Sequence, residues 1–296
     1  MSSVSTDRIR HVALSDLNRR DFIRGLVAAP LIGVSAVSAY ARLVEPYRYL
    51  VSQTTVEIRN LPDSFNGFRI TQLTDIHHSR ILGLDEIRRM VNVARQTRPD
   101  MFVLTGDYTT SYRRYIEPCA EVLSALHAPE GVWAVLGNHD HYTDPELTTR
   151  ALQNKRITVL NNLNTTLRRN TDKIQLAGVD DWTWAASDWN KAFQGLDTKF
   201  PTILLSHQPR VLDFPETQKV SLILSGHTHG GQIDLPVIGP PARFLTKDLK
   251  YSRGLFRREN TQLYVSSGTG VIGLPVRFGV QPEVAVLTLQ RSQDSR

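Results

Sequence analysis

The stretch ITQLTDIH, residues 70–77, joins a short apolar run to two side chains that commonly bind metals, Asp75 and His77. An apolar run of this length that ends in polar residues is typical of a buried strand. Four more stretches have the same form: MFVLTGD at 101–107, VWAVLGNHD at 132–140, ILLSH at 203–207 and LILSGHTH at 222–229. Ligands bind beyond the carboxyl ends of the strands in an α/β sheet, so we expect the polar side chains after all five runs to converge at one sheet edge.

Helical patterns separate these runs. The apolar residues of one predicted helical face are Ile87, Met90, Val91 and Ala94, and a proline at 99 closes that helix. Residues 113–127 and 145–154 are also predicted to be helical. Because strands and helices alternate, the sequence predicts an α/β domain.

The predicted domain has a short approach and a short tail. The side chains of residues 54–58 alternate with the period of two that is typical of a strand. Pro62-Asp63 predicts a turn after them. We therefore expect a connector with the first strand at 42–65, the main catalytic domain at 66–290 and a polar tail at 291–296.

Three Asp, one Asn and five His follow the five apolar runs, and buried together they would need a cation to offset their charge. The set offers oxygen and imidazole but no thiolate, which suits Mn, Fe, Zn or Co. The alternation Asp75-x-His77 predicts an extended segment with both side chains on one face, and His227-x-His229 predicts the same. Glycines at 106, 137, 226, 230 and 231 would let the backbone pass close to the ions or adopt positive φ.

The order of these motifs resembles that of the calcineurin-like metallophosphoesterase superfamily. The motifs are Asp-x-His, Gly-Asp, Gly-Asn-His-Asp, a single His and Gly-His-x-His, spanning residues 75–229. The stretches GHTHGGQ at 226–232 and LPVRFG at 274–279 resemble more narrowly the YkuE/YaeI-like branch of exported bacterial phosphodiesterases. The resemblance implies a four-layer α-β-β-α sandwich of two mixed sheets, with the metal site at the strand C-terminal ends.

The resemblance also implies a role for each motif residue. Asp75, His77 and His229 would bind one divalent ion, Asn138, His207 and His227 a second, and Asp107 both. His139 would face the leaving group, and Asp140 would orient His139. Two adjacent ions can activate a bridging hydroxide for in-line attack on phosphorus, and an imidazole can protonate the departing oxygen.

The function expected from these residues is hydrolysis of a phosphodiester or pyrophosphate bond. Lipid-linked and nucleotide-sugar substrates, such as a UDP-diacylglucosamine-like molecule, are candidates. An exported phosphomonoesterase is one alternative. A non-catalytic metal-dependent binding protein is another, although such a protein would need neither His139 nor the full ligand set.

Residues outside the motifs have weaker signals. His141 and Arg277 are candidate substrate contacts, with a role supporting the site or in solvent as the alternative for His141 and a structural ion pair for Arg277. The stretch GTGVIG at 268–273 matches a dinucleotide-binding pattern, but Pro275 prevents a following helix, so we expect a tight loop near the metal edge. Residues 235–259 mix cationic and apolar side chains and predict either a solvated loop or a cover over an anionic substrate.

Composition excludes several classes of protein. The 296 residues carry a formal charge of +6 without a Lys/Arg run, so nucleic acid is not an expected partner. A weakly positive surface suits an anionic substrate. Cys119 is the only cysteine, so neither an internal disulfide nor a cysteine-based zinc site can form.

The first 41 residues resemble a twin-arginine export signal. Arg19-Arg20 precede Asp21-Phe22-Ile23, and residues 25–41 carry no charge. The predicted partner is the twin-arginine export machinery, and the predicted location is the periplasm or the outer face of the cytoplasmic membrane. Seventeen uncharged residues are also close to the length of a membrane span, so anchoring through residues 25–41 stays open.

Overall fold

The computed structural model describes residues 33–185, 187–244 and 246–292. The chain divides into two units, Met1–Tyr40 and Ala41–Arg296, and the sheets belong to the second. Residues 33–43 are helical. The predicted export signal lies largely outside the described residues. Across the described ranges, no helix combines the length and the apolar character that a membrane crossing requires.

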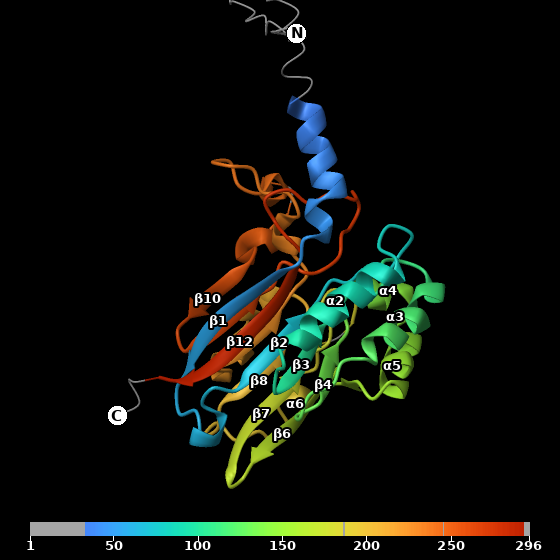
Figure 1. Ribbon diagram of the computed structural model, residues 1–296. Coiled ribbons are helices and arrows are strands. Elements are labelled where there is room, and N and C mark those ends of the chain that lie inside the picture. The colour runs from blue at the N-terminus through green and yellow to red at the C-terminus, as the bar shows by residue number, and fades with distance from the viewer. Residues whose placement is uncertain (1–32, 186, 245, 293–296) are drawn as a thin grey trace, which may run out of the picture. The chain divides into compact units, whose positions relative to one another are not determined.

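Two mixed six-stranded sheets form the centre of the second unit (Figure 1). The first sheet has the order β1 (Leu50–Ile58), β12 (Glu283–Arg291), β2 (Arg69–Leu73), β3 (Met101–Thr105), β4 (Val132–Val135) and β5 (Thr158–Val159). The second has the order β10 (Gly254–Arg258), β11 (Thr261–Val265), β9 (Leu222–Ser225), β8 (Thr202–Leu205), β7 (Asp172–Gly178) and β6 (Leu163–Arg169). Strands β2 to β5 are mutually parallel, and so are β7, β8, β9 and β11.

Helices flank the sheets. The α-helices are α2 (Leu84–Gln96), α3 (Ile116–Leu123), α4 (Asn138–Thr143), α5 (Pro145–Asn154) and α6 (Trp189–Ala192). The 3-10 helices are η2 (Glu45–Tyr47), η3 (Asp63–Phe65), η4 (Arg113–Tyr115), η5 (Pro209–Asp213), η6 (Pro215–Lys219), η7 (His229–Gly231), η8 (Pro241–Phe244) and η9 (Asp248–Tyr251).

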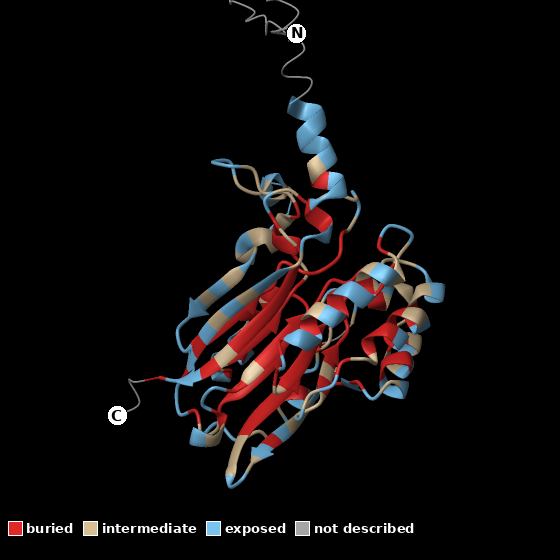
Figure 2. Cartoon of the chain, in the orientation of Figure 1, coloured by how far each residue is buried: buried red, intermediate tan, exposed pale blue. Residues whose placement is uncertain are grey.

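The core has three apolar layers, because successive strand side chains point to opposite faces. In β3, Phe102 and Leu104 pack with α2, α3 and α5, whereas Met101 and Val103 pack between the sheets. A third layer lies between the second sheet and the segment of α6, η5 and η6. Figure 2 shows that the central strands are mostly buried and that the helices beside them have both buried and exposed residues. The expected α/β fold with two mixed sheets is confirmed, and its fourth layer is made mostly of 3-10 turns.

Two boundaries differ from the expectation. Strand β1 begins at Leu50 and pairs with β12 in parallel, from Leu50 opposite Glu283 to Ile58 opposite Arg291. The strand expected at 54–58 is therefore part of β1, and residues 50–53, expected to lead into it, belong to the sheet as well. The predicted helix at 113–127 is shorter, because residues 113–115 form η4 and only residues 116–123 are α-helical.

Candidate metal centre

The motif residues follow the carboxyl ends of five strands, as expected, but the strands come from both sheets. Strands β2, β3 and β4 of the first sheet lead to Asp75, Asp107 and Asn138. Strands β8 and β9 of the second sheet lead to His207 and His227. The site therefore lies where the ends of two sheets meet, which the prediction of a single sheet edge did not anticipate.

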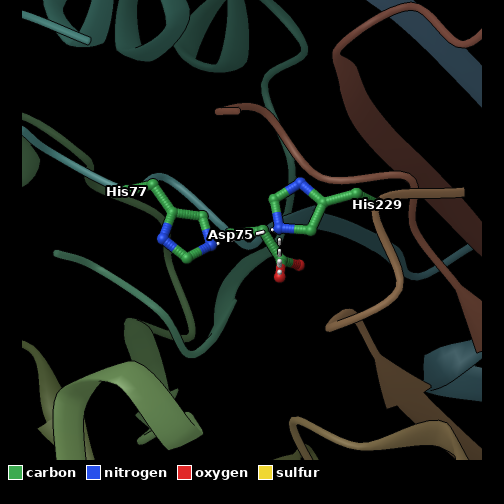
Figure 3. Close-up of side chains that lie close together, drawn as sticks. All are labelled: Asp75, His77 and His229. Atoms are coloured by element: carbon green, nitrogen blue, oxygen red, sulfur yellow. Dashed lines mark hydrogen bonds and ion pairs between the residues drawn. The ribbon is translucent and has the colours of Figure 1, made fainter. Parts of the chain in front are cut away.

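Asp75, His77 and His229 form one group of donors, drawn in Figure 3. His229 Nε2 lies 3.3 Å from Asp75 Oδ1 and 3.1 Å from His77 Nε2. All three residues are buried. The Asp75 carboxylate also accepts hydrogen bonds from the Thr74 hydroxyl at 2.8 Å and from the backbone N–H of His227 at 2.9 Å. These bonds fix the carboxylate in the orientation that faces the two imidazoles.

A second group comprises Asp107, Asn138, His207 and His227. Asn138 Oδ1 lies 3.1 Å from His207 Nε2 and 3.0 Å from His227 Nδ1. His207 Nδ1 is 2.7 Å from the carbonyl oxygen of Thr105, and because that oxygen can only accept, Nδ1 carries the proton. His207 therefore presents Nε2 to the site, and its tautomer is fixed by the backbone.

Asp107 joins the two groups. Its Oδ2 atom lies 3.5 Å from His77 Nε2 and 3.2 Å from His207 Nε2. Its Oδ1 atom accepts a hydrogen bond of 2.9 Å from the backbone N–H of His139. One buried carboxylate thus faces donors on both sides.

The backbone at the ligands differs from the expected extended form. Asp75 and His77 have φ of 53° and 54°, Asp107 has 59°, and His227 and His229 have 71° and 51°. Non-glycine residues in this left-handed region carry strain, which clusters at functional sites. The prediction that each Asp-x-His or His-x-His pair lies on an extended segment was wrong. The side chains converge because the chain turns at each ligand.

Two glycines make room for the carboxylates. A Cβ atom on Gly137 would lie 2.3 Å from Asp107 Oδ1, and one on Gly226 would lie 2.3 Å from Asp75 Oδ2. Both distances are far below contact distance. The expected role of these glycines in close approach is confirmed.

Two of the imidazoles are neutral at pH 7, as metal binding requires, and a third is not. Burial lowers the pKa of both His77 and His229 to about 3, so each is neutral at pH 7. Burial alone would also lower the pKa of His207, but the charge of Asp107 and the hydrogen bond to it raise this pKa to about 10. The same contacts outweigh burial at Asp107 and hold its pKa below the ordinary range.

The donors fit divalent cations. Neutral His77 and His229 place two ring nitrogens 3.1 Å apart, where at most one N–H can donate and the other nitrogen must accept. Two buried carboxylates and an amide oxygen complete a set of oxygen and imidazole ligands. Three overlapping groups have ligand atoms within 4.8 Å of one another: Asp75, His77 and His229; His77, Asp107 and His139; and Asp107, His207 and His227. The residues therefore form a divalent metal site.

His139 lies beside the donors, with its ring 4.9 Å from that of His77, and its ring is held by a backbone carbonyl and not by Asp140. His139 Nδ1 lies 2.6 Å from the carbonyl oxygen of Thr110. The fully buried Asp140 carboxylate instead accepts the backbone N–H groups of Gly137, Asp107 and Tyr108, at 2.9, 2.7 and 3.0 Å. Burial and the nearby charge of Asp107 raise its pKa to about 7. Asp140 thus holds the backbone of Asp107 and the start of α4, and the carbonyl of Thr110 orients His139.

The two expected substrate contacts have structural roles. Arg277 is fully buried, and its guanidinium donates to the carbonyl oxygens of Ser267, Gly268 and Gly270 at 2.9, 3.1 and 2.6 Å. It cannot reach a substrate, because its donors are used to hold this loop. The 268–270 segment braces the site, since Gly270 N donates to the Asp75 carbonyl at 2.7 Å. The expected loop near the metal edge is confirmed.

His141 is the second of these contacts. Its Nε2 atom lies 2.6 Å from Asp180 Oδ1, and the imidazole is 10% exposed. The pair fastens the end of α4 to the segment after β7, which matches the supporting role considered for His141. Three tryptophans follow Asp180 in the sequence. Trp182 and Trp189 pack on Phe214, whereas Trp184 is 58% exposed.

The sequence reasoning missed Thr110 and Asp248. Asp248 Oδ2 lies 3.8 Å from His227 Nε2, on the side of the ring away from Asn138. The proximity of the His227 imidazole is the main reason that the pKa of Asp248 is lowered to about 2. Asp248 belongs to the 235–259 segment, whose mixed composition marked it as a possible cover without indicating this residue.

The fold and the site define a metallophosphoesterase. Residues 68–231 match the calcineurin-like phosphoesterase family, and the chain belongs to this family. All seven expected ligands lie within this range. The chain is therefore a metal-dependent hydrolase of phosphate esters.

Relatives extend over most of the chain. The uncharacterized metallophosphoesterase YkuE of Bacillus subtilis is 32% identical over 290 residues, which are 94% of this chain and 99% of YkuE. The phosphodiesterase YaeI of Escherichia coli is 28% identical over 277 residues, 92% of this chain and 99% of YaeI. A transmembrane protein with a metallophosphoesterase domain from Danio rerio is 32% identical over 286 residues, 92% of this chain and 64% of that protein.

Proposed function

We propose that this chain hydrolyses a phosphodiester or pyrophosphate bond with two divalent ions that share Asp107. The observation that carries the proposal is the position of Asp107 Oδ2, 3.5 Å from His77 Nε2 and 3.2 Å from His207 Nε2. A carboxylate between two donor groups is what a two-ion site requires. The donor set favours Mn, Fe, Zn or Co.

Most of the site residues are proposed to bind the ions, and one is proposed to transfer a proton. Asp75, His77 and His229 would hold one ion, and Asn138, His207 and His227 the other. Such a pair of ions would lower the pKa of a bound water, so that it becomes a nucleophile. Their positive charge would also stabilise the negative charge that develops on the phosphate oxygens during the attack. Because Asp140 fixes the backbone of Asp107, the shared carboxylate keeps its place when the ions are exchanged.

His139 is proposed to protonate the leaving group. Its Nδ1 proton is donated to the Thr110 carbonyl, so Nε2 is the nitrogen that exchanges a proton with substrate. The ring lies edge-on to His77, with centroids 4.9 Å apart, beside the donors. A general acid at this position contributes about 10²–10⁴-fold to the rate.

A diester is preferred as substrate over a monoester because the relative YaeI is named a phosphodiesterase. Lipid-linked and nucleotide-sugar substrates belong to this proposal, since residues 235–259 bring cationic and apolar side chains to the site. Export through the twin-arginine machinery, and membrane association through residues 25–41, are proposed from the sequence pattern. The name of the Danio rerio relative, a transmembrane protein, supports membrane association.

The test is turnover by the Mn²⁺-loaded protein of bis-p-nitrophenyl phosphate and p-nitrophenyl phosphate. A larger kcat/KM for the diester supports the proposal, and a larger value for the monoester supports an exported phosphomonoesterase. Absence of turnover with Mn, Fe, Zn and Co at full metal occupancy would contradict both. Asp107→Asn is the matched variant, which should lose turnover and metal together.

A further inference from the structure

An open groove of about 750 Å³ lies beside the metal centre. It is bordered by η5, η8 and η9, and it is lined by Arg210, Asp213, Arg243, Phe244, Thr246, Lys247, Leu249 and Lys250. These side chains come from residues 210–213 and 243–250, which contain none of the proposed metal ligands and not His139.

The groove is continuous with the site through two residues. Asp248 stands between the lining residues Lys247 and Leu249, and its Oδ2 atom is 3.8 Å from His227 Nε2. Arg210 follows the ligand His207 by three positions, and its guanidinium is 4.0 Å from Asp248 Oδ1. Asp248 therefore links the groove residue Arg210 to His227 of the second group of donors.

The charge of the groove is positive. Four cationic side chains line it against one carboxylate, Asp213. That carboxylate accepts from Lys250 Nζ at 2.7 Å and from the Tyr251 hydroxyl at 2.9 Å, so it is already bound. In the described part of the chain, neither Arg243 nor Lys247 pairs with a carboxylate. Two cations thus face an open groove without a partner anion.

An aromatic ring accompanies these cations. Phe244 is 71% exposed, and the Arg243 guanidinium lies 4.7 Å from its ring centroid. An exposed ring beside a guanidinium is suited to an organic group that carries an anion.

We propose that this groove binds a second phosphate group of the substrate, apart from the phosphate that is cleaved, through Arg243 and Lys247. The inference rests on the proposed function and narrows it to substrates with two separated phosphates. Arg210 lines the same groove, and Asp248, at 4.0 Å from its guanidinium, partly offsets its charge. A phosphate in the groove gains charge-assisted hydrogen bonds that a substrate with one phosphate cannot make.

Two substrates with the same leaving group test the proposal. They are thymidine 5′-(p-nitrophenyl phosphate) and the same compound with a 3′-phosphate. For the wild-type protein we expect the 3′-phosphate to lower KM by about tenfold, the effect of one charged hydrogen bond. Lys247→Glu and Arg243→Glu should each abolish that difference and leave kcat/KM for the compound without the 3′-phosphate unchanged within about twofold.

Arg168→Glu is the matched control. Arg168 is exposed and pairs in register with Lys173 at the start of β7, at the opposite end of the sheet from the ligands. This reversal changes the net charge by the same amount and should leave both KM values unchanged. Equal losses for both substrates in Lys247→Glu, or no change for either, would overturn the proposal.

A binding measurement separates this inference from the proposed function. Calorimetry with thymidine 3′,5′-bisphosphate and thymidine 5′-monophosphate should show about tenfold tighter binding of the bisphosphate, lost in Lys247→Glu. If the protein turns over neither ester but keeps this difference, the hydrolase proposal fails and the groove stands. If Lys247→Glu weakens only sedimentation with phosphatidylglycerol vesicles, the cations bind lipid headgroups and the inference fails.

Discussion

His139 Nδ1 and the carbonyl oxygen of Thr110 are 2.6 Å apart, although 29 positions of chain separate the residues. The contact joins the start of α4 to the loop after β3, and it leaves Nε2 of His139 for the substrate. Because this contact holds the ring through the backbone, we expect that His139 can be removed without displacing the proposed ligands.

We predict that His139→Ala lowers kcat by about 10²–10⁴-fold and keeps the metal content of the wild type. The reason is that His139 transfers a proton, whereas the seven ligands hold the ions. Kinetics together with elemental analysis provide the measurement. His127→Ala is the control, since His127 is exposed and its ring contacts the nearby Ala125 carbonyl, away from the site. Loss of metal in His139→Ala would mean that His139 is a ligand.

Asp140→Asn should separate the two roles considered for Asp140. The carboxylate accepts three backbone N–H groups, and an amide would turn a donor toward them, so we expect a loss of about 2–3 kcal/mol in the free energy of unfolding. Because those bonds hold Asp107, metal affinity should fall about 10–100-fold. Denaturant titration and metal titration measure the two effects, with the exposed Asp85→Asn as control. A variant with normal metal affinity but lower kcat would restore the role of orienting His139.

Metal binding should release a proton from His207. With the pKa of His207 raised to about 10, its imidazole is protonated in the metal-free protein at pH 7, and a bound cation must displace that proton. His77 and His229, with pKa values lowered to about 3, release none. Affinity at this position should therefore rise with pH from 6 to 8, by about tenfold per unit.

Calorimetry in buffers of different ionisation enthalpy counts the released protons. We expect about one proton, and none in His207→Gln. Affinity that is flat across this pH range would contradict the protonated state of His207.

The pair of His141 and Asp180 should make stability depend on pH. Burial lowers the pKa of His141, but the hydrogen bond and charge of Asp180 outweigh it and raise the pKa overall. A raised folded-state pKa gives stability that is fully present below the ordinary pKa of about 6.5 and is lost as pH rises through the folded value. His141→Gln should therefore cost about 1–2 kcal/mol more at pH 5.5 than at pH 9 in denaturant unfolding. An equal cost at both values would show that the pair is uncharged.

Gly226→Ala tests the space around Asp75. The added Cβ would lie 2.3 Å from Asp75 Oδ2, so the carboxylate must move, and we expect loss of metal binding. Gly83→Ala is the matched control, because its Cβ meets only the flexible Glu86 carboxylate at 3.2 Å. Elemental analysis after equal loading compares the two. Full metal content in Gly226→Ala would show that the Asp75 carboxylate is not held where the structure has it.

Sequence alone was sufficient to predict that the seven proposed ligands converge, because each follows an apolar strand of the α/β fold. It was insufficient for Asp140 and Arg277, whose roles depend on which backbone groups surround them after folding. Asp140 sits in the first turn of α4 and accepts the N–H at its start, a capping position that the motif Gly-Asn-His-Asp does not distinguish from a catalytic one.

The backbone at the ligands was also beyond sequence reasoning. Alternation along Asp75-x-His77 is compatible with an extended strand, and only the packing of loops from both sheets forces φ to 53° and 54°. Asp248 lies 21 positions after His227, in a stretch without periodic pattern, so no local signal connects the two residues.

The most direct measurement is anomalous diffraction from crystals of the Mn²⁺-loaded protein. The account predicts two anomalous peaks on either side of the Asp107 carboxylate, one beside Asp75, His77 and His229 and the other beside Asn138, His207 and His227. A single peak at full loading, or an Asp107 carboxylate that contacts neither ion, would contradict it.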